Sequence, residues 1–261
     1  MFYRVDYMLA VLCAGFIAGW LFGKRTARLK PDHLGFGYYV ATAVLLLVRA
    51  AAFTGYMVLP EQRIWNGASG ITADLTGFLF GALFGLALRR NEARDFLVDR
   101  SVLDALRMTI AFTFILAGIG KAFSMGPMTE FFTQSGYSIA FLKFIVIAEI
   151  LGSIGLLLPW AVVPALIGLS IDMLGAVITH VHNGDPLNDS TGAIGLLIRL
   201  AALAVLWMLR PKHNQQRAAT LRGSVLRVCA LFGVCLLIAA GGSRAMRHPG
   251  VPAPMTSPAS K

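Results

Sequence analysis

Long, uninterrupted apolar runs dominate this sequence, and they constrain its fold more than any other feature. An α-helix needs about 20 predominantly apolar residues to cross the hydrocarbon core of a bilayer. The chain of 261 residues contains several runs of that length, because 57% of its residues are hydrophobic and only 14% are charged. An ordinary soluble domain is about 25% charged. The sequence therefore predicts an all-α, polytopic membrane protein.

The runs predict about eight transmembrane helices in three parts. A basic loop at 89–100 separates three N-terminal helices (1–100) from four helices with short connections (101–210), which are typical of a four-helix bundle. The remainder, 211–261, contains an eighth helix, which either spans the membrane or lies at its inner interface, and a tail rich in Pro and Ser. The expected spans are 5–23, 34–59, 70–88, 102–121, 138–158, 161–180, 191–209 and 225–241.

The net charge of +10 is concentrated in three short loops between these spans. Such clustering follows the positive-inside rule, and it argues against a nucleic-acid partner. We therefore expect a bacterial inner-membrane protein with an external N-terminus, cytoplasmic basic loops and an external segment at 181–190. The clustered residues are Lys24, Arg25, Arg28 and Lys30, then Arg89, Arg90, Arg94 and Arg100, then Arg210, Lys212, Arg217 and Arg222.

The three cysteines, Cys13, Cys229 and Cys235, all lie inside apolar runs. Because no Cys-x-x-Cys pair occurs, a dithiol redox mechanism lacks its reactive groups. Neither a covalent haem motif nor a dinucleotide fingerprint is present. We therefore expect no covalent cofactor, so that any quinone or haem would be held non-covalently.

Charged residues inside the spans are the candidate functional groups. A charge near the bilayer centre costs at least about 2.5–3.5 kcal/mol, so that each one requires a partner or a polar cavity. Arg107 and Lys121 share one face of their helix, about 21 Å apart at 1.5 Å per residue. They either snorkel to the two interfaces or form a polar stripe that faces the bundle interior. The charged set is Arg49, Asp74, Arg107, Lys121, Lys143, Glu149, Asp172 and Arg199.

Glu149 and Asp172 are the acidic residues expected in the second group of helices. Glu149 lies near the middle of its span, where it is either protonated and hydrogen-bonded or paired with a cation. Asp172 and Arg199 lie at equal depth on successive antiparallel helices, so we expect an ion pair between them. Arg49 and Asp74 are expected to form a second pair.

The segment "THVHNGDPLND" (179–189) joins two predicted spans and contains two histidines beside acidic residues. It is either a solvated capping loop, a histidine pair that handles protons or gates access, or a metal site. His180 and His182 project about 200° apart on a helix and cannot chelate one ion from one face. "NGDP" is first a turn sequence, in which Gly supplies a positive φ. We therefore expect no metal here.

Three motifs in the second group of helices resemble a known family. They are "AGIGKAF" (117–123), "AEILGSIGLLL" (148–158) and the polar loop after "GAVITHVHN". Residues 101–210 resemble the DoxX family and its MauE-like relatives, which are four-helix membrane proteins. The resemblance rests on Arg107, Gly118, Lys121, Glu149 and Gly152 in the family's order. It implies a redox-associated membrane subunit, because family members include a thiosulfate:quinone oxidoreductase subunit and a methylamine-utilisation maturation protein. It implies no particular substrate.

Residues 1–90 weakly resemble the start of prolipoprotein diacylglyceryl transferase. A basic loop is followed by "LVRAAAFTGYMVLPE" (47–61) and "WNGASGITADLTGFLFG" (65–81). The enzyme's His-Gly-Gly signature is missing, and Thr72, Ala73 and Asp74 stand in its place. This departure argues against transferase chemistry in the first unit.

These observations favour an accessory subunit of a membrane redox or quinone-linked process, with a polar interior site. Its expected partners are membrane lipids and a membrane or periplasmic redox protein. The sequence does not identify a cofactor, and a non-covalently bound quinone is the candidate. Two alternatives are a lipid-modifying transferase with a histidine base and a small-solute or proton permease with carboxylate carriers. The expected site residues are Arg107, Lys121, Glu149, Asp172, His180, His182 and Arg199.

Overall fold

The computed structural model describes residues 4–26, 29–58, 62–90 and 93–210, and its regular structure there is entirely helical. Seven of the described helices are long and apolar enough to cross a membrane, which confirms the predicted polytopic all-α fold. The predicted span 225–241, and the C-terminal unit 211–261 that contains it, lie outside the described residues. The elements are α1 (Val5–Thr26), α2 (Pro31–Val58), α3 (Gln62–Ala87), α4 (Ala93–Leu97), α5 (Arg100–Phe123), α6 (Met125–Gln134), α7 (Ile139–Leu157), α8 (Val162–Asn183), the 3-10 helix η1 (Leu187–Ser190) and α9 (Thr191–Leu209).

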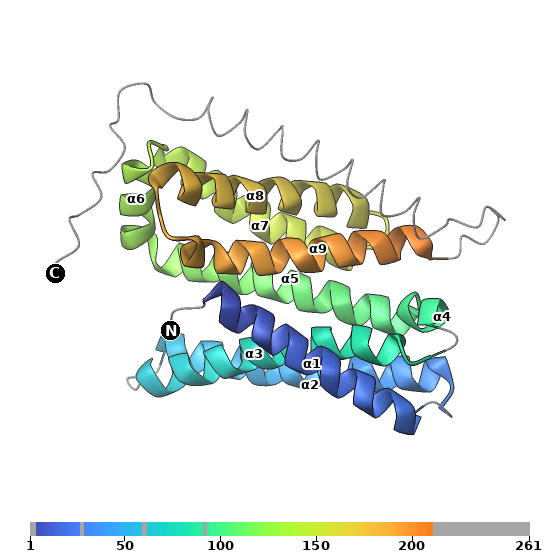
Figure 1. The fold of residues 1–261 in the computed structure, drawn as a ribbon. Coiled ribbons are helices and arrows are strands. Elements are labelled where there is room, and N and C mark those ends of the chain that lie inside the picture. Colours follow the sequence, from blue (N-terminus) through green and yellow to red (C-terminus); the bar gives the residue numbers. More distant parts are fainter. Residues whose placement is uncertain (1–3, 27–28, 59–61, 91–92, 211–261) are drawn as a thin grey trace. The chain divides into compact units, whose positions relative to one another are not determined.

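The described residues cluster into two compact units (Figure 1). The first unit contains the chain up to Thr109 and again from Ala202, and the second contains Ile110–Ala201. The long helices α5 and α9 therefore contribute to both units. The domain boundaries expected after residues 100 and 210 stay predictions.

In the first unit, α1 crosses α3 at backbone-to-backbone distance (Figure 1). A Cβ atom added to Gly15 would overlap the carbonyl oxygen of Phe78, and one added to Gly85 would overlap the carbonyl oxygen of Phe16. Gly19 and Gly81 face the opposite backbone in the same way. Small residues allow membrane helices to approach this closely. Such close packing is needed in a bilayer, because lipid tails provide no hydrophobic force that would pull the helices together.

Two arginines of the basic loop 89–100 contact α1 and the residues that follow it. The Arg89 guanidinium lies 3.7 Å from the centroid of the Trp20 ring. Arg90 donates hydrogen bonds to the carbonyl oxygens of Thr26 (3.2 Å) and Leu29 (2.6 Å). The last carbonyl groups of a helix have no intrahelical donor, so a cation at the end of α1 satisfies them and complements the helix dipole.

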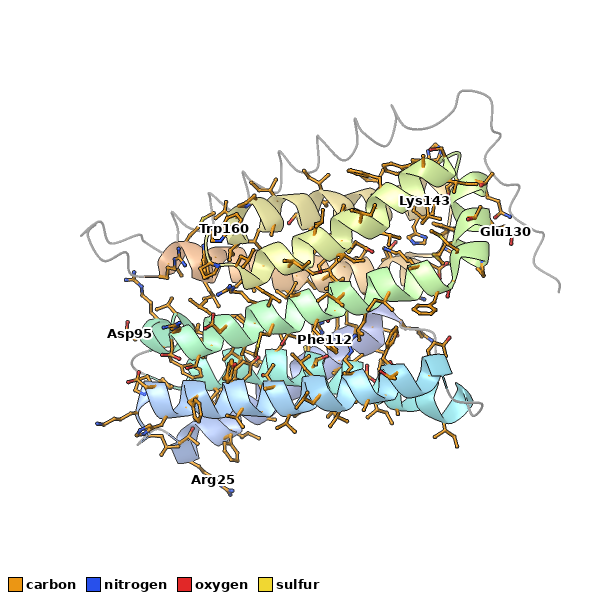
Figure 2. The ribbon with its side chains drawn as sticks, turned by 180° about the vertical axis from the view of Figure 1, so that it is seen from behind. Arg25, Asp95, Phe112, Glu130, Lys143 and Trp160 are labelled. Atoms are coloured by element: carbon orange, nitrogen blue, oxygen red, sulfur yellow. The ribbon has the colours of Figure 1, made fainter. Side chains whose placement is uncertain are left out.

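In the second unit, α7 and α8 form an antiparallel pair joined by a short turn. Ser138 caps the start of α7 by accepting a hydrogen bond from the Phe141 amide (3.2 Å). Figure 2 labels the exposed Lys143 near one end of α7 and Trp160 in the turn at the other end. Trp and Lys are typical of membrane–water interfaces, so these two residues bracket a membrane-spanning segment.

Helix α6 lies crosswise at the end of α7 and α8 (Figure 1). The sequence predicted no element between the spans 102–121 and 138–158, because ten residues are too short for a span. Met128, Phe131 and Phe132 of α6 line a cavity in the second unit, so this short helix positions part of the candidate site.

Candidate functional site

The centre of the candidate site is an ion pair between α5 and α7. Lys121 Nζ donates a hydrogen bond to Glu149 Oε1, and the Glu149 side chain is only 1% exposed. Lys121 is the last basic residue of α5, and Glu149 lies in the middle of α7. Lys121 therefore turns inward rather than snorkelling, and Glu149 meets a cation, which was one of the two arrangements expected for it.

Asp172 of α8 completes a three-residue cluster with this pair. Its carboxyl group interacts with the charges of Glu149 and Lys121, and it lies within hydrogen-bonding reach of the Glu149 carboxyl. The predicted Asp172–Arg199 ion pair is not seen, since the ion pairs described in this unit are Lys121–Glu149 and His180–Asp185. Equal depth placed Asp172 and Arg199 at one level of the membrane, but the rotation of each helix decides which side chains meet.

Two oxygen atoms of this cluster have no hydrogen-bond partner. They are Glu149 Oε2 and Asp172 Oδ2, and both are buried. Carboxylate oxygens only accept hydrogen bonds, so two of them facing each other do not satisfy one another unless a proton or an external donor lies between them. A buried acceptor without a donor is costly, and such a group requires an explanation.

A cavity of about 800 Å³ opens beside the cluster. Lys121 and Asp172 contribute its charged groups, while most of its wall is apolar. One end is lined by five aromatic rings whose successive centroids lie 5.2 to 6.2 Å apart. These rings belong to Phe131, Phe132, Tyr137, Phe141 and Phe144.

Small residues keep the rest of the cavity open. Gly168 and Gly175 of α8 line it, and a Cβ atom added to either would have no atom within 4 Å. Gly152 and Gly155 of α7 also line it, but an added Cβ atom there would meet Leu169 and Ala165 of α8. The cavity is therefore mostly apolar with the charged groups of Lys121 and Asp172 at its wall, a composition that suits a tailed molecule with a polar head.

His180 lines the cavity at the end of α8. Its Nδ1 atom lies 2.8 Å from Asp185 Oδ2, and its ring centroid lies 5.4 Å from that of Phe131. His182 is exposed and does not line the cavity, which agrees with the predicted angle of about 200° between the two side chains. The proposed histidine pair therefore consists of one residue inside the cavity and one outside it.

The loop after α8 ties α6 to this end of the cavity. Gly184 adopts φ 75°, as the turn sequence predicted, and its amide donates to the end of α8. Asn183 Nδ2 donates a hydrogen bond to Ser135 Oγ (2.8 Å), which follows α6. In the described residues, no three histidine, cysteine, aspartate or glutamate side chains converge in a way that could hold a metal ion.

Arg107 and Arg199 do not belong to the cavity lining. Arg107 lies in the first unit, where Nη1 donates to Asp104 Oδ1 (2.7 Å) and the guanidinium lies 5.3 Å from the Trp207 ring centroid. Along α5, Arg107 is about 21 Å from Lys121, too far to share one site. Arg107 therefore lies outside the cluster to which the sequence assigned it.

The pair predicted between Arg49 and Asp74 is not among the ion pairs of the described residues. Asp74 instead accepts a hydrogen bond from the Tyr7 hydroxyl group at 3.1 Å. Asp74 lies in the middle of α3, and the sequence did not identify Tyr7 of α1 as its partner.

Sequence reasoning also missed Tyr137 and the aromatic wall. Tyr137 is 4% exposed, and its hydroxyl group lies 2.9 Å from Thr179 Oγ1 in a buried hydrogen bond. The available signal was the density of aromatic residues between 131 and 144. In an apolar membrane sequence, such residues resemble ordinary lipid-facing or core positions, so their convergence was not visible.

Residues 105–209 match the model of the DoxX-like family, which confirms the resemblance predicted for this part of the chain. The matched segment is shorter than half of the chain and contains Lys121, Glu149, Asp172 and His180. The chain has no significant match among curated proteins or solved structures.

Proposed function

We propose that this protein, DoxX-like over residues 105–209, is an accessory subunit of a quinone-linked redox process in the bacterial inner membrane. Its DoxX-like segment would form a four-helix bundle that holds an amphiphilic quinone in the cavity of the second unit. The bound quinone would supply the capacity to carry two electrons and two protons. Electrons would come from a separate membrane or periplasmic redox protein, because the chain has no covalent haem motif, dinucleotide fingerprint or dithiol pair.

The observation that carries this proposal is the cavity itself. Ligand sites commonly enclose about 300–1,000 Å³, with mostly apolar walls and a few polar groups that fix orientation. The volume of about 800 Å³ lies within that range. A quinone fits this chemistry: its ring suits the aromatic wall, its isoprenoid tail suits the apolar remainder, and its oxygens suit a single polar position.

The residues of the cluster have distinct roles in this proposal. Lys121 holds Glu149 in place through the bond to Oε1, and both groups act on the carboxyl group of Asp172. Asp172 lines the cavity and offers an acceptor at its wall. His180, paired with Asp185, also lines the cavity and is the proposed group for passing protons.

The proposed quinone link is tested by organic extraction of the purified protein, followed by quantification of quinone per mole of protein. We expect a stoichiometric quinone in the wild type and its loss in Gly168→Leu, whose side chain would fill the cavity. Gly67→Leu, in α3 of the first unit, is a matched control because its added side chain also enters open space. Equal quinone content in all three proteins would assign the quinone to bulk lipid and reject the proposal.

A lipid-modifying transferase is a second candidate, and one observation favours it. His180 lines the cavity and is oriented by Asp185 at 2.8 Å, which is the arrangement of a general base held by a carboxylate. Incubation with radiolabelled phospholipid and acceptor peptides would reveal group transfer, and His180→Gln would abolish it. If the protein releases no labelled product under any of these conditions, this candidate fails.

The membrane orientation is tested by cysteine labelling in a variant without native cysteines. We expect Asp189→Cys, in the exposed segment before α9, to react with an impermeant maleimide in intact cells. Arg25→Cys, at the exposed end of α1, should react only after lysis, since the basic loops are expected to be cytoplasmic. The reverse labelling pattern would overturn the proposed orientation.

A further inference from the structure

The polar cluster beside the cavity has more acceptors than donors. Lys121 Nζ donates to Glu149 Oε1, whereas Glu149 Oε2 and Asp172 Oδ2 are buried without a donor. The Tyr137 hydroxyl group, a further donor in the cavity lining, is already engaged with Thr179. A ligand head at this position would be stabilised by bringing O–H or N–H groups, and destabilised by bringing only acceptors.

The charges of the cluster also favour a ligand head that donates hydrogen bonds. Glu149 and Asp172 are two acidic groups, and Lys121 is the basic group that pairs with Glu149 and acts on Asp172. His180 and Asp185, the other ion pair of this unit, compensate each other when His180 is protonated. An anionic head would add repulsion in a low-dielectric site, whereas a neutral donor or a cation would not.

The neighbouring wall suits such a head and its tail. The aromatic rings from Phe131 to Phe144 offer π faces, which attract cations and pack against flat rings. The open stretch along Gly168 and Gly175 leaves room for a chain. One molecule can therefore place its head at Asp172 and its tail in the apolar part of the cavity.

We propose that the cavity selects amphiphiles by the hydrogen bonds of their heads. It binds single-tailed molecules whose neutral or cationic head donates hydrogen bonds to the Asp172 carboxyl group beside the Lys121–Glu149 pair, and it discriminates against heads that only accept hydrogen bonds or are anionic. For one source of such a ligand, a reduced quinone, the inference rests on the proposed function. The other source with the same chemistry is a lipid with an amine or hydroxyl head.

The experiment compares tail-matched pairs of probes that differ in the head. Isothermal titration of the protein in lipid nanodiscs, with empty nanodiscs as the blank, measures decylubiquinol against decylubiquinone and dodecylamine against dodecanoate. We expect the donor-headed member of each pair to bind at least about tenfold more tightly, because hydrogen bonds to charged acceptors are among the stronger ones. Equal affinity within both pairs, or tighter binding of decylubiquinone and dodecanoate, would overturn the inference.

Variants assign the selectivity to the cluster. Asp172→Asn removes one negative charge and supplies its own N–H donor to Glu149, so the tenfold preference should fall to about twofold or less. Asp189→Asn, the same change at an exposed carboxylate outside the cavity, should leave the preference intact.

If Asp172→Asn does not fold, Gly168→Leu provides the second test, since it should weaken binding of every probe without touching the cluster. Unchanged binding in Gly168→Leu would place the probes outside the cavity and reject the inference.

The two proposals fail in different ways. If decylubiquinol and decylubiquinone both fail to bind while dodecylamine binds and dodecanoate does not, the head selectivity stands and the quinone link fails. If both quinone forms bind equally, and dodecylamine binds no better than dodecanoate, the quinone link stands and the selectivity fails.

Discussion

Two pairs of glycines, one pair in each compact unit, have opposite surroundings. In the first unit, Gly15 and Gly85 lie where α1 and α3 touch backbone to backbone, and any side chain would overlap the other helix. In the second unit, Gly168 and Gly175 face a cavity, and a side chain would meet nothing. The same residue type therefore allows close packing at the first pair of positions and leaves space at the second.

This difference indicates what each unit can do. Close helix packing leaves no room for a ligand between α1 and α3 at these glycines. The second unit maintains a cavity, and its helices are joined by polar contacts such as Lys121–Glu149, Tyr137–Thr179 and Asn183–Ser135. In lipid, packing and interhelical hydrogen bonds replace the hydrophobic force that would hold such helices together in water.

The largest expected effect comes from a substitution that breaks the close packing of α1 and α3 in the first unit. Gly85→Leu would force α1 and α3 apart, since the added side chain meets the backbone of Phe16 and Trp20, which cannot move independently. We expect a loss of more than about 5 kcal/mol, in the exceptional range for a single substitution. Unfolding in SDS, followed by circular dichroism, measures this loss, and Gly67→Leu in the same helix should unfold like the wild type. A stable Gly85→Leu protein would contradict the glycine contact.

The second largest effect comes from a substitution in the polar cluster of Lys121, Glu149 and Asp172. Lys121→Met would leave Glu149 and Asp172 without their cation, at a cost of about 3–5 kcal/mol. The double variant Lys121→Met, Glu149→Gln should recover most of this loss, because it removes one of the two unpaired acidic charges. A double-mutant cycle in the same SDS assay measures the coupling, and strictly additive losses would mean that Lys121 and Glu149 do not interact.

A smaller effect concerns the buried hydrogen bond at the cavity wall. Tyr137→Phe removes the hydroxyl group that lies 2.9 Å from Thr179 Oγ1, at an expected cost of about 1 kcal/mol. Thr179 keeps its bond to the Gly175 carbonyl oxygen, so it is not left without a partner. The exposed Tyr56→Phe on α2 is the control and should have no effect. A loss above that of Lys121→Met would indicate a larger role for Tyr137.

The smallest expected effect is a stabilisation, and it tests the contrast between the two pairs of glycines most directly. Gly175→Ala should stabilise the protein by about 0.5–1 kcal/mol, because alanine is favoured over glycine inside a helix and the added Cβ meets no atom. Gly85→Ala, the same change in the first unit, should destabilise it, because that Cβ meets the α1 backbone. If both substitutions shifted stability in the same direction, the contrast between the two units would be lost.

Much of this arrangement was predictable from the sequence, because it depends on local composition. Seven of the expected spans correspond to helices, since about 20 apolar residues can satisfy their backbone in lipid only as a helix. The cost of intramembrane charge identified Lys121, Glu149 and Asp172 as candidates, and the positive φ at Gly184 followed from a turn sequence. Each of these inferences concerns one segment considered alone.

Only the tertiary structure decided which candidates meet. Glu149 pairs with Lys121, and the charged groups acting on Asp172 are those two residues rather than Arg199. Helical periodicity gives the face that a residue shares with its own neighbours, but the rotation of one helix against another depends on packing along the whole contact. The same reason explains the aromatic wall and the opposite uses of Gly85 and Gly175, because a glycine marks either contact or space only once the neighbouring helix is in place.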